Sequence, residues 1–196
     1  NDIVIDRHGR SYFSDPKYVG PERMELPSMD VYRLDPDGSL HRATTDITKP
    51  NGIMLSPDGK TLYVAETDNG TDQAESVTDA KVGRMTLNAF PVRSDGTLGP
   101  KRVLVDFGEQ TGIDGMTVDA NGRIYAAVRS AKKFGIVIFH PDGMELTRIK
   151  TPWLPTNCCF GRGVDLHTLY VTAGGGFYRI RLNATGHHSA LAGADR

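Results

Sequence analysis

The feature that most constrains the fold is a unit that recurs four times: an apolar strand, a tight turn and a strand that carries an aromatic residue. The unit occupies residues 6–13, 56–64, 119–125 and, more loosely, 163–171. Its turn glycines Gly9, Gly59 and Gly122 lie 50 and 63 residues apart. Repeats of this period made of short strands are typical of a β-propeller, with one blade per repeat. A propeller directs the first strand of each blade toward a central channel, where ligands bind.

Each of the first three repeats has a second turn, at Asp37-Gly38, Asp95-Gly96 and Asp142-Gly143, between strand-like runs. Two hairpins per repeat predict a four-stranded blade. Asp-Gly pairs supply the positive φ that two-residue hairpin turns require. No window keeps a helical apolar stripe free of Gly or Pro. The sequence therefore predicts an all-β fold. A β-sandwich is the alternative. It would account for the paired turns but not for their recurrence in a fixed order.

The bulk properties of the 196 residues exclude several classes of partner. A net charge of −1 argues against a nucleic-acid partner. Without an apolar run near 18 residues or a lysine-led signal segment, we expect no membrane partner. Cys158 and Cys159 are adjacent, about 3.8 Å apart at Cα and too close for an ordinary disulfide. We expect two small buried side chains. A chain without a disulfide fits either the cytoplasm or the periplasm, so the compartment stays open. The sequence does not indicate the oligomeric state.

The four repeats, of about 49 residues each, fill the chain, which opens at Asn1 within a strand-like run. We therefore expect residues 1–196 to form one propeller domain of about four blades. A strand at the first residues also leads us to expect that upstream sequence is missing, with Asn1 and Arg196 bordering an open gap.

Three polar residues occupy equivalent positions in successive repeats. Asn1, Asn51 and Asp114 each precede the turn glycine of their repeat by 8 residues. Equal offsets place the three side chains at one height, at the channel end of three inner strands. Two amides and a carboxylate are oxygen ligands suited to Ca²⁺ or Mg²⁺. Asn and Asp more often cap turns, but three identical offsets favour a site.

The six histidines and the long loops carry weaker signals. No histidine shares the offset of Asn51 and Asp114, so we expect all six to be solvated surface residues. The loops Asp15–Met29 and Thr67–Gly83 should return to the face that bears the site. They are either candidate lids or mobile surface, and the sequence does not decide between the two.

Four segments resemble motifs of the gluconolactonase or regucalcin (senescence marker protein) family: residues 1–6, 50–64, 113–119 and 156–172. The resemblance implies a six-bladed propeller of lactone hydrolases with one divalent cation in its channel. It makes Asn51 and Asp114 metal ligands, and Asn1 a residue that contacts substrate or completes the metal sphere. The family's glutamate ligand belongs on a blade upstream of Asn1. The resemblance thus implies that this chain is the last four of six blades.

The function that follows is metal-dependent hydrolysis of a small-molecule lactone of the sugar-lactone type. The cation, Ca²⁺ first and Mg²⁺, Zn²⁺ or Mn²⁺ otherwise, would polarise the carbonyl and stabilise the oxyanion. By its place in the family, Asp114 could also deprotonate the attacking water. Two alternatives stay open: a phosphoester hydrolase on the same site, as in the related diisopropyl fluorophosphatase, and a non-catalytic interaction module. Titration with metal would separate the enzymes from the module.

Overall fold

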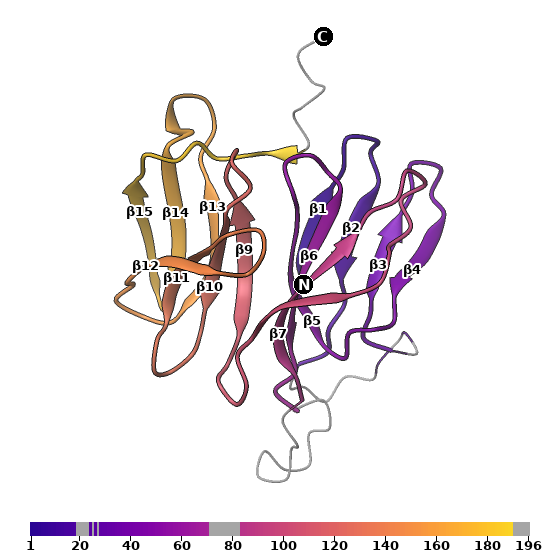
Figure 1. Cartoon of the computed structure of the whole chain (residues 1–196), viewed down its shortest axis with the longest axis horizontal. Helices are drawn as coiled ribbons and strands as arrows, with labels where there is room; N and C mark the ends of the chain where they lie inside the picture. The colour runs from indigo at the N-terminus through magenta and orange to yellow at the C-terminus, as the bar shows by residue number, and fades with distance from the viewer. Residues whose placement is uncertain (19–23, 25, 27, 71–82, 190–196) are drawn as a thin grey trace.

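The computed structural model describes residues 1–18, 24, 26, 28–70 and 83–189. The described chain is almost entirely strand and turn, which confirms the predicted all-β fold (Figure 1). Its strands form four antiparallel sheets. The first holds β1 (Ile3–Ile5), β2 (Ser11–Ser14), β3 (Val31–Leu34) and β4 (Leu40–Thr44); the second holds β5 (Pro50–Leu55), β6 (Thr61–Thr67), β7 (Met85–Pro91) and β8 (Arg102–Asp106). The third holds β9 (Ile113–Val118), β10 (Ile124–Val128), β11 (Gly135–Phe139) and β12 (Glu145–Ile149); the fourth holds β13 (Pro155–Phe160), β14 (Thr168–Ala173) and β15 (Gly176–Arg181).

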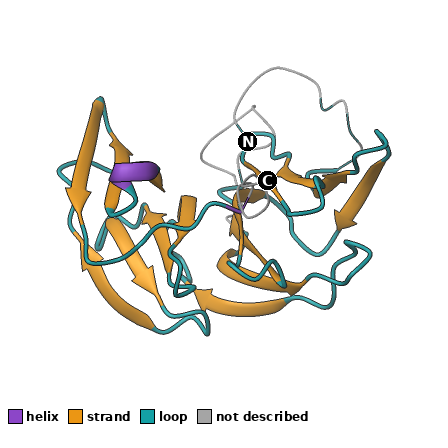
Figure 2. Cartoon of the chain, turned by 90° about the horizontal axis from the view of Figure 1, so that it is seen from above, coloured by secondary structure: helices purple, strands orange, loops and turns teal. Residues whose placement is uncertain are grey.

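The first strand of each sheet lies innermost, as the repeat pattern predicts. Strand β1 contacts β5, β5 contacts β9, and β9 contacts β13. Seen from above, the sheets follow one another around an open arc (Figure 2). This is the arrangement of successive blades in a propeller.

Three apolar layers hold the arc together, one between each pair of neighbouring sheets. Ile53 and Leu62 belong to the layer between the first and second sheets. Leu87 and Met116 belong to the next layer, and Tyr125 packs edge-to-face on Phe160 in the third, at 5.0 Å between ring centroids. Because strand side chains alternate between faces, the middle sheets bury both faces.

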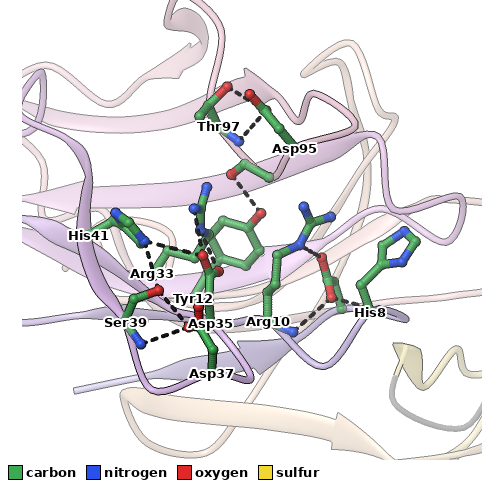
Figure 3. Close-up of polar contacts among 12 residues, drawn as sticks. His8, Arg10, Tyr12, Arg33, Asp35, Asp37, Ser39, His41, Asp95 and Thr97 are labelled. Carbon is green, nitrogen blue, oxygen red and sulfur yellow. Dashed lines mark hydrogen bonds and ion pairs between the residues drawn. The ribbon is translucent and has the colours of Figure 1, made fainter.

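The repeated turns are longer than predicted. Asp6 and Asp119 accept backbone N–H groups from within their turns and a side-chain bond from Arg10 and Arg123, each at 2.6 Å. The backbone N–H of Asp6 donates to the carbonyl of Arg10, and that of Asp119 donates to the carbonyl of Arg123. Each of these bonds closes a loop of three residues, 7–9 and 120–122. The two-residue prediction was therefore wrong. Glycine closes a three-residue loop with positive φ, at +80° in Gly9. Figure 3 shows the turn around His8 and Arg10 and the neighbouring turns.

The fourth sheet has three strands in the described part of the chain, not the four we predicted. After β15 the chain leaves the sheet and crosses toward the channel (Figure 1). Its backbone instead completes other elements: Leu182 donates to the carbonyl of His167, Gly186 to Leu166, and His187 to Val118 of β9. We call residues 182–189 the crossing segment. Hydrogen bonds to two sheets replace those of a fourth strand.

The two end sheets each leave a partly apolar face open to solvent. On the first sheet, Ile3 is 59 % exposed and Phe13 stacks on Tyr32. On the fourth, Phe177 is 70 % exposed and stacks on Tyr170. Cys159 is exposed and Cys158 buried, so the expectation of two buried thiols was half wrong: neighbouring strand residues face opposite sides. No helix among the described residues is long and apolar enough to cross a bilayer.

Candidate functional site

Strands β5 and β9 bring Asn51 and Asp114 together at the channel end, as their equal offsets predict. Each is followed by a glycine that the packing requires. A Cβ on Gly52 would collide with the backbone carbonyl of Asp114, and a Cβ on Gly115 would collide with the side chain of Asn157. The Thr67 hydroxyl donates to the carbonyl of Ile113 at 2.6 Å and ties the second sheet to the third beside Asp114. The inner strands therefore approach closely where the polar groups lie.

The carboxylate of Asp114 sits in a partly desolvated, mixed-charge environment. Burial raises its pKa above the ordinary value, while the Arg129 guanidinium and the Asn51 amide act in the opposite direction. Nη1 of Arg129 lies 2.9 Å from Oδ2 of Asp114. Arg129 follows β10, and the sequence reasoning missed it because nothing in its local pattern marks it.

The amide oxygen of Asn51 has no hydrogen-bond partner among the described residues although it is buried. The residue is only 4 % exposed. A buried polar atom without a partner is costly and rare in folded proteins. This oxygen is therefore positioned for a group that binds there.

Asn1 lies just before β1, the inner strand of the first sheet, and is exposed. Its backbone nitrogen donates to the carbonyl of Ser14 at 2.8 Å, and its part in substrate binding stays a prediction. The adjoining Asp2 turns inward and accepts a bond from the backbone N–H of Ile53 at 3.2 Å. Burial raises the pKa of Asp2, and the charge of Asp114 adds to that rise. The sequence reasoning did not single out Asp2.

Tyr18, from the first predicted lid loop, also reaches this end of the channel. Its hydroxyl is buried without a partner in the described chain. Burial raises its pKa, and the Asp114 charge adds to the effect. Nζ of Lys49 lies 5.7 Å from the Tyr18 ring centroid and donates to Oδ1 of Asn69 at 3.1 Å. Part of the first predicted lid, residues 19–23, 25 and 27, and most of the second, residues 71–82, lie outside the described residues.

The histidines stay away from Asn51 and Asp114, but they are not all solvated as predicted. His8 and His140 are exposed at turns and His41 is exposed on β4, and Figure 3 shows His8 and His41 among the turn aspartates. His187 is half-buried in the crossing segment, where burial lowers its pKa. The expectation failed there because the C-terminal segment packs on β9 through the backbone of His187. It also failed at His167 and His188, which are half-buried, with ring nitrogens 2.8 and 2.9 Å from the carbonyls of Ala184 and Gly161.

The donor set fits a hard divalent cation better than a soft one. The Asn51 amide oxygen, without a partner in the part of the chain that the structure describes, and the Asp114 carboxylate lie side by side, and such oxygens suit Ca²⁺ or Mg²⁺. Within the described ranges, no three His, Cys, Asp or Glu residues come close enough to hold a metal.

Comparison with known proteins adds a family assignment to this geometry. Residues 1–175 match the sequence profile of the SMP-30/Gluconolactonase/LRE-like region. A gluconolactonase of Zymomonas mobilis is 31% identical over 193 residues, covering 95% of this chain and 51% of the relative. Pentonolactonase XacC of Haloferax volcanii is 31% identical over 179 residues, covering 90% of this chain and 53% of the relative. The chain thus spans about half the length of these curated relatives.

Solved structures agree on the fold. A gluconolactonase from Xanthomonas campestris matches with a TM-score of 0.74 at 31% identity, over 93% of this chain and 56% of that one. The calcium-binding protein regucalcin from Agrobacterium tumefaciens matches with a TM-score of 0.72 at 21% identity, over 97% of this chain and 63% of that one. The second likeness shows the fold alone.

Proposed function

Because the chain belongs to the SMP-30/gluconolactonase/LRE-like family, we propose that it carries the metal-binding half of a sugar-lactone hydrolase site. The observation that carries the proposal is the buried amide oxygen of Asn51, which no described residue hydrogen-bonds, beside the Asp114 carboxylate. Relatives named gluconolactonase and pentonolactonase give the reaction class.

Asn51 and Asp114 would hold one divalent cation, with Ca²⁺ the preferred ion. When bound, the cation supplies electrophilic polarisation of the lactone carbonyl. Of these two residues, Asn51 is a neutral ligand and Asp114 carries the negative charge. The Asp114 carboxylate accepts a proton from the attacking water. Asn1 binds the substrate at the start of the neighbouring inner strand.

The test is metal binding and lactone hydrolysis by the full-length protein and by Asp114→Asn. The substitution keeps the side chain's shape but removes the charged ligand and the base. We expect weaker Ca²⁺ binding in calorimetry, and turnover lower by roughly 10²–10⁴-fold. Asn51→Ala should weaken Ca²⁺ binding but leave the base in place. The matched control is Glu145→Gln, on the exposed outer strand β12.

The alternatives predict other results. If Ca²⁺ does not bind the wild-type protein, the interaction module gains support. A nidogen/laminin complex shares the fold with a TM-score of 0.64 at 18% identity, so the architecture does not require catalysis. If Ca²⁺ binds but only phosphoesters turn over, the site is a phosphoester hydrolase.

We also propose that the four sheets form part of a larger propeller, whose further blades cover the open faces of the end sheets. Support comes from Ile3 and Phe177, which are 59 % and 70 % exposed. The equivalent faces of the middle sheets are buried against neighbours. Exposed apolar surface of this kind marks an interface.

A further inference from the structure

We infer that Arg129 recognises an anionic substituent on the lactone, so that the preferred substrates are acidic sugar lactones and not neutral ones. The inference rests on the proposed lactonase function and names its substrate class. It begins from a juxtaposition: the guanidinium of Arg129 lies beside Asp114, and the buried ammonium of Lys49 lies beyond the Tyr18 ring.

Most of the hydrogen-bonding capacity of Arg129 is unused. A guanidinium has five N–H donors in a planar fork. In the described part of the chain, the side chain bonds only through Nη1, to Oδ2 of Asp114. The side chain is 32 % exposed, so the rest of the fork is open to a ligand. This fork matches the geometry of a carboxylate or phosphate.

Lys49 adds positive charge nearby. The residue is 1 % exposed, and buried charges are normally paired. The partners that the described chain gives its Nζ are neutral, the Oδ1 atom of Asn69 and the Tyr18 ring. Both Arg129 and Asp114 act electrostatically on Tyr18, so Lys49 and Arg129 both lie near this tyrosine.

The balance of charge then favours an anion. In the described part of the chain, the positive charges of Arg129 and Lys49 lie around the Tyr18 ring with the single negative charge of Asp114. The excess of charge on this side of the site is therefore positive. A substrate that carries a carboxylate or a phosphate supplies the missing counter-charge, whereas a neutral sugar lactone leaves the guanidinium without it.

The experiment compares three lactones with the full-length protein: glucono-1,5-lactone, which is neutral, glucaro-1,4-lactone, which carries a carboxylate, and 6-phosphoglucono-1,5-lactone. We expect higher kcat/KM for at least one anionic lactone, and the two anionic arms show which oxyanion fits. Arg129→Gln should reduce the preference by roughly 10- to 100-fold, the range for a lost charge-assisted hydrogen bond. The control Arg179→Gln, on exposed β15, should keep the preference.

Arg129→Lys provides a second variant in case the glutamine variant does not fold. It keeps the charge but loses the fork, so the preference should fall by a smaller factor. The inference would be overturned if the wild-type protein showed no preference for anionic over neutral lactones. It would also be overturned if the Arg129 variants kept that preference. If no lactone is hydrolysed, the proposed function fails, and calorimetric titration then compares the affinities of the intact lactones. Equal affinities of neutral and anionic lactones would overturn the inference separately.

Discussion

At the residue scale, the candidate site depends on its glycines as much as on its polar side chains. The amide of Asn51 reaches Asp114 only because Gly52 lets β5 approach the backbone of β9. The sequence predicted Asn51 and Asp114 because equal distances from a turn impose equal heights in repeated hairpins. It could not predict Arg129, since this residue lies beyond a strand end, where the path of the loop decides which way a side chain points.

Gly52→Ala tests this close approach. The added methyl group collides with the carbonyl of Asp114, so the inner strands must separate. We expect the free energy of unfolding to fall by about 1–3 kcal/mol, as overpacking costs, and Ca²⁺ binding to weaken. Urea denaturation and calorimetry measure the two effects.

Gly175→Ala is the matched control, because its new methyl group would meet no heavy atom within 4 Å and its φ is not in the left-handed region. If both substitutions have the same small effect, the inner strands do not depend on Gly52.

At the scale of elements, each hairpin end is organised by one aspartate. Asp119 is fully buried and accepts bonds from two backbone N–H groups, the Arg123 side chain and the Tyr125 hydroxyl. The turns were predictable from Asp and Gly, but their length was not: it follows from how the aspartate folds back on its own loop. The path of the crossing segment could not be predicted from the sequence either. Its bonds to β9 are made by backbone groups, which every residue type carries.

Asp119→Ala should therefore destabilise the protein far more than a change at an exposed turn. It leaves buried donors without an acceptor, and we expect a loss of about 3 kcal/mol in the free energy of unfolding. In Asp142→Ala the lost acceptor is an exposed Oδ1 that bonds the backbone N–H of Met144. Water can replace that acceptor, so this control should lose much less stability. Equal losses in urea denaturation would contradict this view of the turn.

The crossing segment should also make stability depend on pH through His187. Burial lowers its folded-state pKa below the ordinary 6.5. As pH falls below that value, the unfolded state binds a proton that the folded state resists. The free energy of unfolding therefore drops toward the folded pKa, by at most about 1.4 kcal/mol per pH unit.

His187→Gln should flatten this drop in denaturation curves recorded between pH 7 and 5, whereas the exposed His140→Gln should not. An unchanged slope in the first variant would mean that His187 is solvated.

At the scale of the whole molecule, four sheets around an arc follow directly from the four repeats. The sequence did not show that the last sheet has three strands in the described chain. The four-strand expectation was carried over from the first three repeats, although the residues after β15 carry no further hairpin signal. The end sheets differ from the middle sheets mainly in that each has one face open to solvent.

Cys159, on the open side of β13, reports whether further blades cover that face. In residues 1–196 expressed alone, a thiol reagent should modify it, while Cys158 stays protected by burial. In the full-length protein the modification of Cys159 should slow by at least about 10-fold, as expected when an interface buries a thiol. Mass spectrometry distinguishes the two sites. Equal rates in the two proteins would argue against covering blades.

The polar residues of the candidate site lie partly on inner strands and partly beyond strand ends, and these two kinds of position tolerate substitution differently. Asn51 and Asp114 lie on inner strands whose spacing is fixed by glycines and by the bond from Thr67 to Ile113. Tyr18 and Arg129 lie beyond strand ends, where replacement disturbs no ladder of hydrogen bonds. Evolution or an engineer can therefore exchange the side chains of Tyr18 and Arg129 while the inner strands that carry Asn51 and Asp114 keep their spacing.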